Sequence, residues 1–201
     1  MITPDVYYRL ADFNTRLFQL TNGDSGSIWV QPVHYIELAG ILCGVILFSL
    51  MLLQAPSREA QNGLRVVLTV ILALVFSALI QSVYFTPRPF ALGFGNQLSP
   101  HAADASFPSD HATYAWAFVT GFVIAGKHRY ALVMTVAACA MSWARIFLGL
   151  HFPVDILGAI LVSSAAALTV RLCLAPFLEI CAGLVRLAGH LRRRLPFAGL
   201  S

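Results

Sequence analysis

The sequence has few charged residues. Only 11% of its 201 residues are Asp, Glu, Lys or Arg, whereas 58% are hydrophobic. Ordinary soluble domains carry roughly 25% charged residues, so the composition excludes a typical soluble protein and indicates a membrane protein. The formal net charge is +4. The basic residues are dispersed or lie near the C-terminus, which is more typical of membrane topology and contacts with anionic lipid than of nucleic-acid binding.

Several patterns with known functions are also missing. The four cysteines lie in apolar segments and no two are spaced Cys-x-x-Cys, so we interpret them as buried free thiols. No cluster of carboxylates suits magnesium, and we therefore expect neither a metal nor another cofactor. Charged residues interrupt the first twenty positions, where a secretory signal would have an apolar core, so we expect insertion to depend on the transmembrane helices.

Five apolar segments predict an all-α integral membrane protein with about five transmembrane helices. They cover residues 33–54, 66–85, 112–126, 130–144 and 156–170. The first two are long enough to cross a bilayer. The other three contain 15 uncharged residues each, which is about 23 Å of helix against a hydrocarbon core of roughly 30 Å. The shortfall disappears if each helix extends by a turn through the polar motif at its end.

Amphipathic segments flank this core of about 33–174. The residues Thr3-Pro4-Asp5 predict a helix start, and apolar residues at spacings of three and four follow. An interfacial helix within residues 1–24 would show this pattern, and so would a helix packed on the bundle. A second interfacial helix is expected over 176–195. We interpret 1–201 as one membrane-embedded domain.

Three polar motifs stand out among the apolar segments. They are Gln-x6-Arg-Pro at 81–89, Pro-Ser-Asp-His at 108–111 and Arg-x5-His-x3-Asp at 145–155. Ionisable residues are costly among membrane helices, so these are candidates for function. Because successive helices alternate in direction, all three motifs are expected at the same side of the membrane.

The basic residues predict which side this is. Nine of the 13 Lys and Arg residues fall on the side opposite the motifs: Arg58, Arg65, Lys127, Arg129, Arg171, Arg186, Arg192, Arg193 and Arg194. Cytoplasmic loops carry an excess of basic residues. The site is therefore expected to face away from the cytoplasm, with the C-terminus inside.

The residue types in the motifs suit phosphoryl transfer. Arg88 and Arg145 can neutralise phosphate oxygens, because a guanidinium group binds them bidentately. Ser109 and the backbone N–H groups around Asp110 and His111 begin the third transmembrane helix, and a helix N-terminus attracts anions.

A histidine and an aspartate form the second part of the expected chemistry. His151 and Asp155 are one helical turn apart, with Pro153 suited to the first turn. The carboxylate can hold one imidazole nitrogen and leave the other free as a nucleophile.

Together, the motifs resemble the signature of the type 2 phosphatidic acid phosphatase superfamily, Lys-x6-Arg-Pro, Pro-Ser-Gly-His and Ser-Arg-x5-His-x3-Asp. The string Ser-Phe-Pro-Ser-Asp-His-Ala at 106–112, preceded by His101 and Asp104, is similar to the bacterial undecaprenyl-diphosphate phosphatase branch. The resemblance implies that His151 attacks to form a phosphohistidine, Asp155 orients it, and His111 protonates the leaving oxygen.

Three residues depart from the family pattern. Gln81 replaces the lysine, which removes a cation but keeps a hydrogen-bond donor at the expected phosphate site. Asp110 replaces the glycine, and its carboxylate should face away from phosphate. Ala144 replaces the serine before Arg145. Beyond the motifs, Glu37 and His34 at the outer end of the first transmembrane segment are expected on the same side of the membrane, where they could line the site or lie among the lipid headgroups.

The branch resemblance implies hydrolysis of a polyprenyl diphosphate, undecaprenyl diphosphate, in the bacterial plasma membrane. This reaction recycles the carrier lipid of peptidoglycan synthesis and is linked to bacitracin resistance. Three alternatives stay open: a phosphatase of another lipid such as phosphatidylglycerophosphate or phosphatidate, a phosphotransferase to a lipid or sugar, and a catalytically silent lipid-binding protein. Glu37, His101 and Asp104 are possible substrate contacts.

Overall fold

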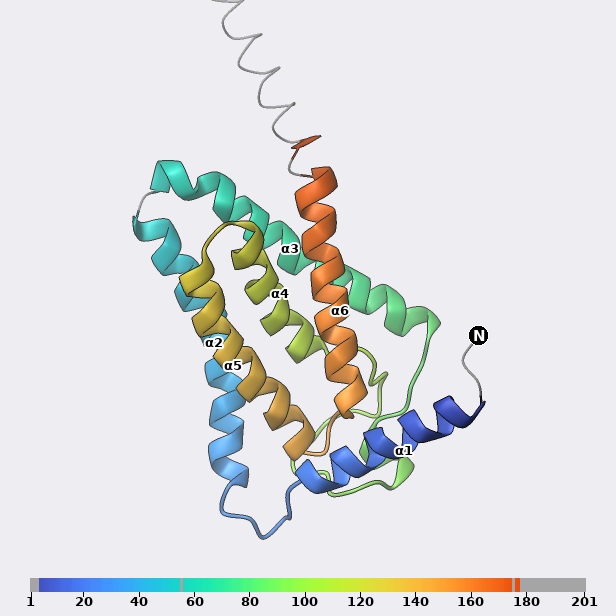
Figure 1. Ribbon diagram of the computed structural model, residues 1–201. Helices are drawn as coiled ribbons and strands as arrows, with labels where there is room; N and C mark the ends of the chain where they lie inside the picture. Colours follow the sequence, from blue (N-terminus) through green and yellow to red (C-terminus); the bar gives the residue numbers. More distant parts are fainter. Residues whose placement is uncertain (1–3, 55, 175, 178–201) are drawn as a thin grey trace, which may run out of the picture.

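The computed structural model describes residues 4–54, 56–174 and 176–177, which are helices joined by loops and contain no strand (Figure 1). This confirms the all-α prediction. The helices are α1 (Pro4–Thr21), α2 (Val30–Gln54), α3 (Pro56–Val83), the 3-10 turn η1 (Pro89–Leu92), α4 (Asp110–Ile124), α5 (His128–Phe147), α6 (Pro153–Thr169) and the π-helical turn η2 (Val170–Leu174).

Four helical stretches of the described chain are long and apolar enough to cross a membrane. They are Val30–Gln54, Gln61–Val83, His128–Phe147 and Pro153–Leu174. The short apolar segments were expected to extend as helix through the neighbouring polar motif. This is confirmed for the end of α5 and for the start of α6. It is wrong for α4, which has only 15 residues. Ser109 is in an extended conformation before this helix, and Gly126 has a left-handed φ of 71° just after it.

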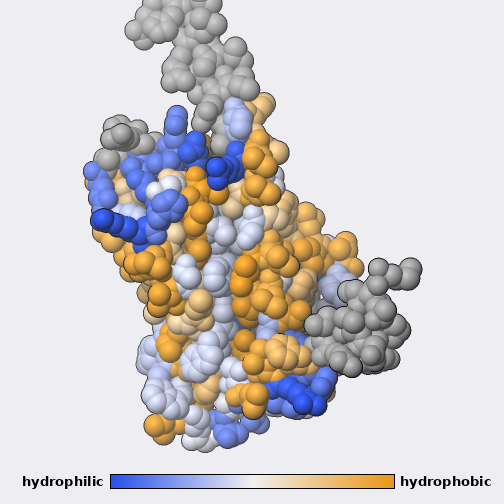
Figure 2. Space-filling model, viewed as in Figure 1, coloured by the Kyte–Doolittle hydropathy of each residue, from blue (hydrophilic) through white to orange (hydrophobic). Residues whose placement is uncertain are grey.

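α4 can be short because it lies at the centre of the bundle, where it packs against α3, α5 and α6 (Figure 1). Its Phe118 and Phe122 form the main core with Met51 of α2 and with Met134 and Met141 of α5. Protein surrounds this helix, whereas the other four present apolar side chains outward. Figure 2 shows these as an orange flank below a blue, hydrophilic upper end.

α1 lies across the lower end of the bundle, over the ends of α5 and α6 (Figure 1). Its apolar stripe faces outward, since Phe13 and Leu20 are 64% and 85% exposed. Phe18 is fully buried on the inner side. The helix therefore both packs on the bundle and presents an apolar face, so the two interpretations of its pattern are compatible. The second interfacial helix, expected over 176–195, lies almost entirely outside the described residues.

Candidate active site

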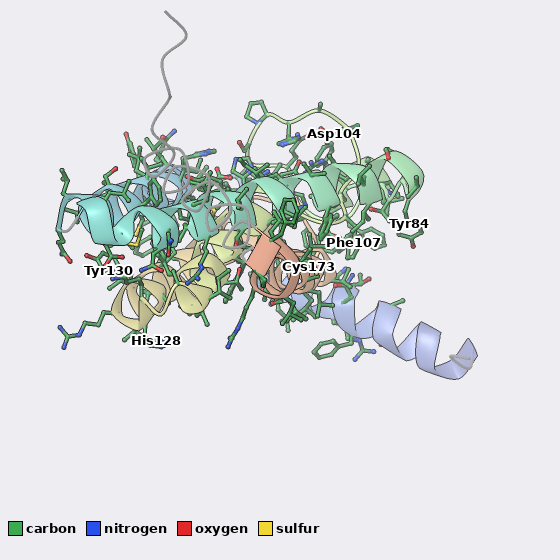
Figure 3. The ribbon with its side chains drawn as sticks, turned by 90° about the horizontal axis from the view of Figure 1, so that it is seen from above. Tyr84, Asp104, Phe107, His128, Tyr130 and Cys173 are labelled. Carbon is green, nitrogen blue, oxygen red and sulfur yellow. The ribbon has the colours of Figure 1, made fainter. Side chains whose placement is uncertain are left out.

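The three motifs meet at the lower end of the bundle, where α3 and α5 end and α4 and α6 begin. The loop between α3 and α4 closes this end. Figure 3 shows Asp104 on that loop, and Tyr84 and Phe107 close together at the end of α3. The rings of Tyr84 and Phe107 are 6.4 Å apart, edge to face.

His151 lies at the centre of the site, in the turn between α5 and α6, and is 1% exposed. Its Nδ1 is 3.0 Å from the carbonyl oxygen of Ser106, and its Nε2 is 3.0 Å from Nη1 of Arg88. A carbonyl only accepts hydrogen bonds and a guanidinium only donates them. Nδ1 therefore carries the hydrogen, and Nε2 presents the lone pair that a nucleophile needs.

His151 is neutral at ordinary pH. Burial, followed by the positive charges of Arg145 and Arg88, holds its pKa well below the usual 6.5. A neutral imidazole retains its lone pair, whereas an imidazolium has none. The surroundings of His151 thus favour the nucleophilic form.

Ser106 links Asp155 to His151, in addition to the direct approach of the two side chains suggested by the one-turn spacing. Oδ2 of Asp155 is 3.5 Å from His151 Nδ1, which is too long for a strong hydrogen bond. Instead, the Ser106 hydroxyl donates to this oxygen at 2.6 Å, and the N–H of Phe152 donates at 2.8 Å. Ser106, which is fully buried, also supplies the carbonyl that holds the ring.

Arg88 is held from several directions and is only 4% exposed. Its Nε donates to Asp104 at 2.7 Å, and its Nη1 donates to the carbonyl of Leu150 at 3.1 Å. Burial raises the pKa of Asp104, but the hydrogen bond and charge of Arg88 outweigh this effect and lower it. The Asp104 carboxylate therefore stays ionised and holds Arg88 beside His151.

Arg145 is 3% exposed and pairs through Nη1 with Glu37 of α2. Its Nε and Nη2 are buried without a hydrogen-bond partner, as is Oγ of Ser109. Ser109 is the N-cap of α4, yet its side chain makes no capping bond. Buried donors are rarely left unpaired, so each needs an explanation. An oxyanion would satisfy all three.

Gln81 and Asp110, two of the three residues that depart from the family pattern, are hydrogen-bonded to each other. Nε2 of Gln81 donates to Oδ1 of Asp110 at 2.8 Å and to the carbonyl of Pro108 at 3.1 Å. The Ser77 hydroxyl donates to the same carboxylate oxygen at 2.7 Å. The Asp110 carboxylate therefore points toward α3, as expected for a negative charge next to a phosphate site. The side-chain amide of Gln81 is hydrogen-bonded to this carboxylate.

The remaining candidates lie around the rim. His111, the second residue of α4, is half-buried and close enough to Arg145 and His151 for their charges to interact. His101 lies 3.8 Å from Asp104 and bonds the neighbouring carbonyl of Ala102. His34 is 3.9 Å from Glu37. Within the described part of the chain, no three His, Cys, Asp or Glu side chains are grouped to hold a metal ion.

Reasoning from the sequence assigned no role to Ser106 or Ser77. Ser106 lies in the motif string at 106–112, but a buried serine next to an aromatic residue has no distinctive pattern. The roles of Asp104 and Glu37 were also undecided. Each proves to be the ionic partner of one arginine.

Several known proteins resemble this chain in sequence or in fold. The model of the PAP2 superfamily matches residues 62–178. The undecaprenyl-diphosphatase BcrC of Bacillus subtilis is 35% identical over 140 residues, which are 70% of this chain and 69% of the relative. An undecaprenyl-diphosphatase of Sulfolobus acidocaldarius is 26% identical over 155 residues, 76% and 74% of the two chains. The crystal structure of Aquifex aeolicus LpxE has a similar fold, with a TM-score of 0.62, 23% identity, and coverage of 78% of this chain and 93% of that one.

Proposed function

The chain belongs to the PAP2 superfamily, and from this membership and the geometry of the site we propose that it hydrolyses undecaprenyl diphosphate to undecaprenyl phosphate and phosphate. The relatives named undecaprenyl-diphosphatase support the substrate. One structural observation carries the proposal: the buried, unpartnered Nε and Nη2 of Arg145 together with Oγ of Ser109. The oxygens of a bound phosphate would supply the hydrogen bonds that these buried groups lack.

The reaction proceeds through two displacements at the terminal phosphorus. Arg145, Ser109 and the first N–H groups of α4 hold the phosphate oxygens. Nη1 of Arg88 moves from Nε2 of His151 to the substrate, and the freed lone pair attacks phosphorus. The bond from phosphorus to the bridging oxygen breaks, and His111 gives this oxygen its proton as undecaprenyl phosphate leaves.

The second displacement restores the enzyme. His111, now without its proton, accepts one from water, and the resulting hydroxide attacks the phosphohistidine. The phosphorus–nitrogen bond breaks, phosphate leaves, and Nε2 of His151 recovers its lone pair. Asp155 and Ser106 hold the ring in one orientation through both steps.

A panel of lipid phosphates tests the substrate. Purified protein in detergent without divalent metal is expected to release phosphate from undecaprenyl diphosphate faster than from phosphatidylglycerophosphate or phosphatidate. Preference for a glycerolipid would contradict the substrate assignment. Phosphate release that depends on an added lipid or sugar acceptor would identify a phosphotransferase. Activity lost with EDTA and restored by magnesium would contradict the metal-independent mechanism.

The orientation in the plasma membrane is part of the proposal. The excess of basic residues at the opposite end supports an extracytoplasmic site and a cytoplasmic C-terminus. Ser99→Cys, in a protein whose native cysteines are replaced, is expected to react with an impermeant thiol reagent on cells whose inner membrane is intact. Labelling only after that membrane is broken would reverse the orientation.

A further inference from the structure

The inner face of α1 contacts the turn that carries the nucleophile. Asn14, Phe18 and Asn22 are four residues apart and so lie on one side of the helix and its end. Each contacts a different part of the segment 147–154, which contains His151. The contacts are therefore distributed along the whole turn.

Asn14 binds the far end of this turn. Its Oδ1 accepts a hydrogen bond from the backbone N–H of Val154 at 3.0 Å. Val154 is in the first turn of α6, where N–H groups have no partner within the helix. Asn14 thus does for α6 what an N-cap side chain normally does, but from another helix. The catalytic Asp155 follows directly.

Asn22 binds the near end of the turn. Its Nδ2 donates to the carbonyls of Phe147 and Asn96, both at 3.0 Å, and its Oδ1 accepts from the N–H of Asn96 at 2.7 Å. Gly149 has a φ of 76° and lies directly against the Asn96 carbonyl, so a side chain at this position would collide with it. Asn22 therefore joins α1, the loop after α3 and the end of α5.

Phe18 supports the middle of the turn. It is fully buried, and its ring centre is 5.2 Å from that of Phe152, the residue after the nucleophile. The ring of Phe94 also packs edge to face against Phe152, with the ring centres 6.1 Å apart. Together, the three contacts leave the turn little freedom to move.

We propose that α1 positions the catalytic nucleophile, with Asn14 and Asn22 as positioning residues for His151. Neither asparagine touches the phosphate site; both act through the backbone on either side of the imidazole. Displacing a reacting group by about 1 Å can cost 10²-fold in rate. The inference rests on the proposed phosphohistidine chemistry, because it assigns these contacts to His151.

Substitution of the two asparagines tests whether they hold the turn that contains His151. Asn14→Ala and Asn22→Ala are compared with Gln19→Ala, a change at an exposed position of the same helix. Alanine favours helix, so the change within α1 does not unfold it. Asn14→Asp keeps the acceptor and places a negative charge at the start of α6, so it should restore function. The readout is acid-quenched phosphohistidine in a single turnover, which separates the rate of formation from the final amount.

We expect the rate of formation to fall about tenfold in both alanine variants, with the final amount and KM nearly unchanged. Gln19→Ala and Asn14→Asp should keep the rate of the unsubstituted protein. A reduced final amount at an unchanged rate would mean that the asparagines only maintain the fold, and would overturn the inference. An unchanged rate and amount would overturn it as well.

Backbone hydrogen exchange gives a second readout that needs no catalysis. Exchange in the peptide covering 148–155 should be faster in Asn14→Ala than in Gln19→Ala. Equal exchange in the two variants would contradict the proposal that Asn14 holds the turn, even if activity changed. If the unsubstituted protein forms no phosphohistidine, the proposed function fails, while the exchange experiment still decides whether α1 holds the turn.

Discussion

Buried ionic groups occur at both ends of the helix bundle, and they differ in how their polar atoms are satisfied. At the upper end, Glu59 of α3 is 8% exposed and accepts from Nζ of Lys127 at 2.5 Å and from Nδ2 of Asn62 at 2.9 Å. At the lower end, Arg145 is buried more deeply and keeps two donors unpaired. Among the described residues, the buried side-chain atoms without a hydrogen-bond partner are Nε and Nη2 of Arg145, Oγ of Ser109 and Oγ1 of Thr113 in the first turn of α4.

The difference separates a structural ion pair from a ligand site. Burial of a charged group does not by itself distinguish the two, because both ends of the bundle bury charged groups. An unpaired buried donor is destabilising unless a ligand satisfies it. In the proposed reaction, the phosphate of the substrate would provide the missing acceptors at the lower end. Four experiments test this difference between the two ends of the bundle.

Loss of the proposed nucleophile should have the largest effect. His151→Ala should eliminate the covalent intermediate and all turnover, since it removes the nitrogen that attacks phosphorus in the proposed reaction. His111→Ala should slow a diphosphate substrate by about 10²–10⁴-fold, and slow a nitrophenyl phosphate much less, because that leaving group needs no proton. Acid-quenched labelling of both variants is the measurement. Labelled phosphate on the His151 variant, with none on the His111 variant, would exchange the two roles.

Matched substitutions at the two ends test the comparison directly. Arg145→Lys keeps the charge but loses the planar fork, so kcat/KM should fall about 10²–10³-fold. Lys127→Met should leave kcat/KM unchanged and lower the free energy of unfolding by about 1–2 kcal/mol, since the pair is only partly buried. Steady-state kinetics and thermal unfolding in detergent measure both. Comparable loss of activity in the two variants would refute the distinction.

Removing the hydroxyl of Ser106 should have an intermediate effect. Ser106→Ala keeps the backbone carbonyl on Nδ1 of His151 but breaks the link to Asp155. We expect kcat to fall about 10–10²-fold with KM nearly unchanged, by analogy with the loss of other groups that orient a catalytic residue. Ser164→Ala, at an exposed position of α6, is the control. Full activity of the Ser106 variant would show that Asp155 acts on the imidazole directly.

Of the four experiments, a change of pH should have the smallest effect on activity. Because burial and two arginines lower the pKa of His151, the acid limb of kcat/KM should lie below pH 6.5. The unfolded chain binds a proton at this residue near pH 6.5 and the folded chain only at lower pH. The contribution of His151 to stability is therefore present above pH 6.5 and is lost as the pH falls from there toward the folded pKa. An acid limb above pH 6.5 would contradict a depressed pKa.

Much of this architecture could be predicted without coordinates. Long apolar segments must become helices in a bilayer, because only internal hydrogen bonds satisfy their backbone there. Alternating directions then bring Arg88, His111, Arg145 and His151 to one end. The motif spacing identified these residues, since the nature and order of the side chains determine the chemistry they can perform.

The way in which these groups are held depends on contacts between distant parts of the chain. Ser106 joins Asp155 to His151 across 49 residues, and Asn14 reaches Val154 across 140. Such contacts leave no periodic pattern in the sequence, because their partners are hydroxyls, amides and backbone groups that occur throughout it. The apolar stripe of α1 was visible in the sequence, but its packing face was not. The helices and the chemical groups of the site therefore follow from local sequence, whereas their distances and hydrogen bonds follow from long-range packing.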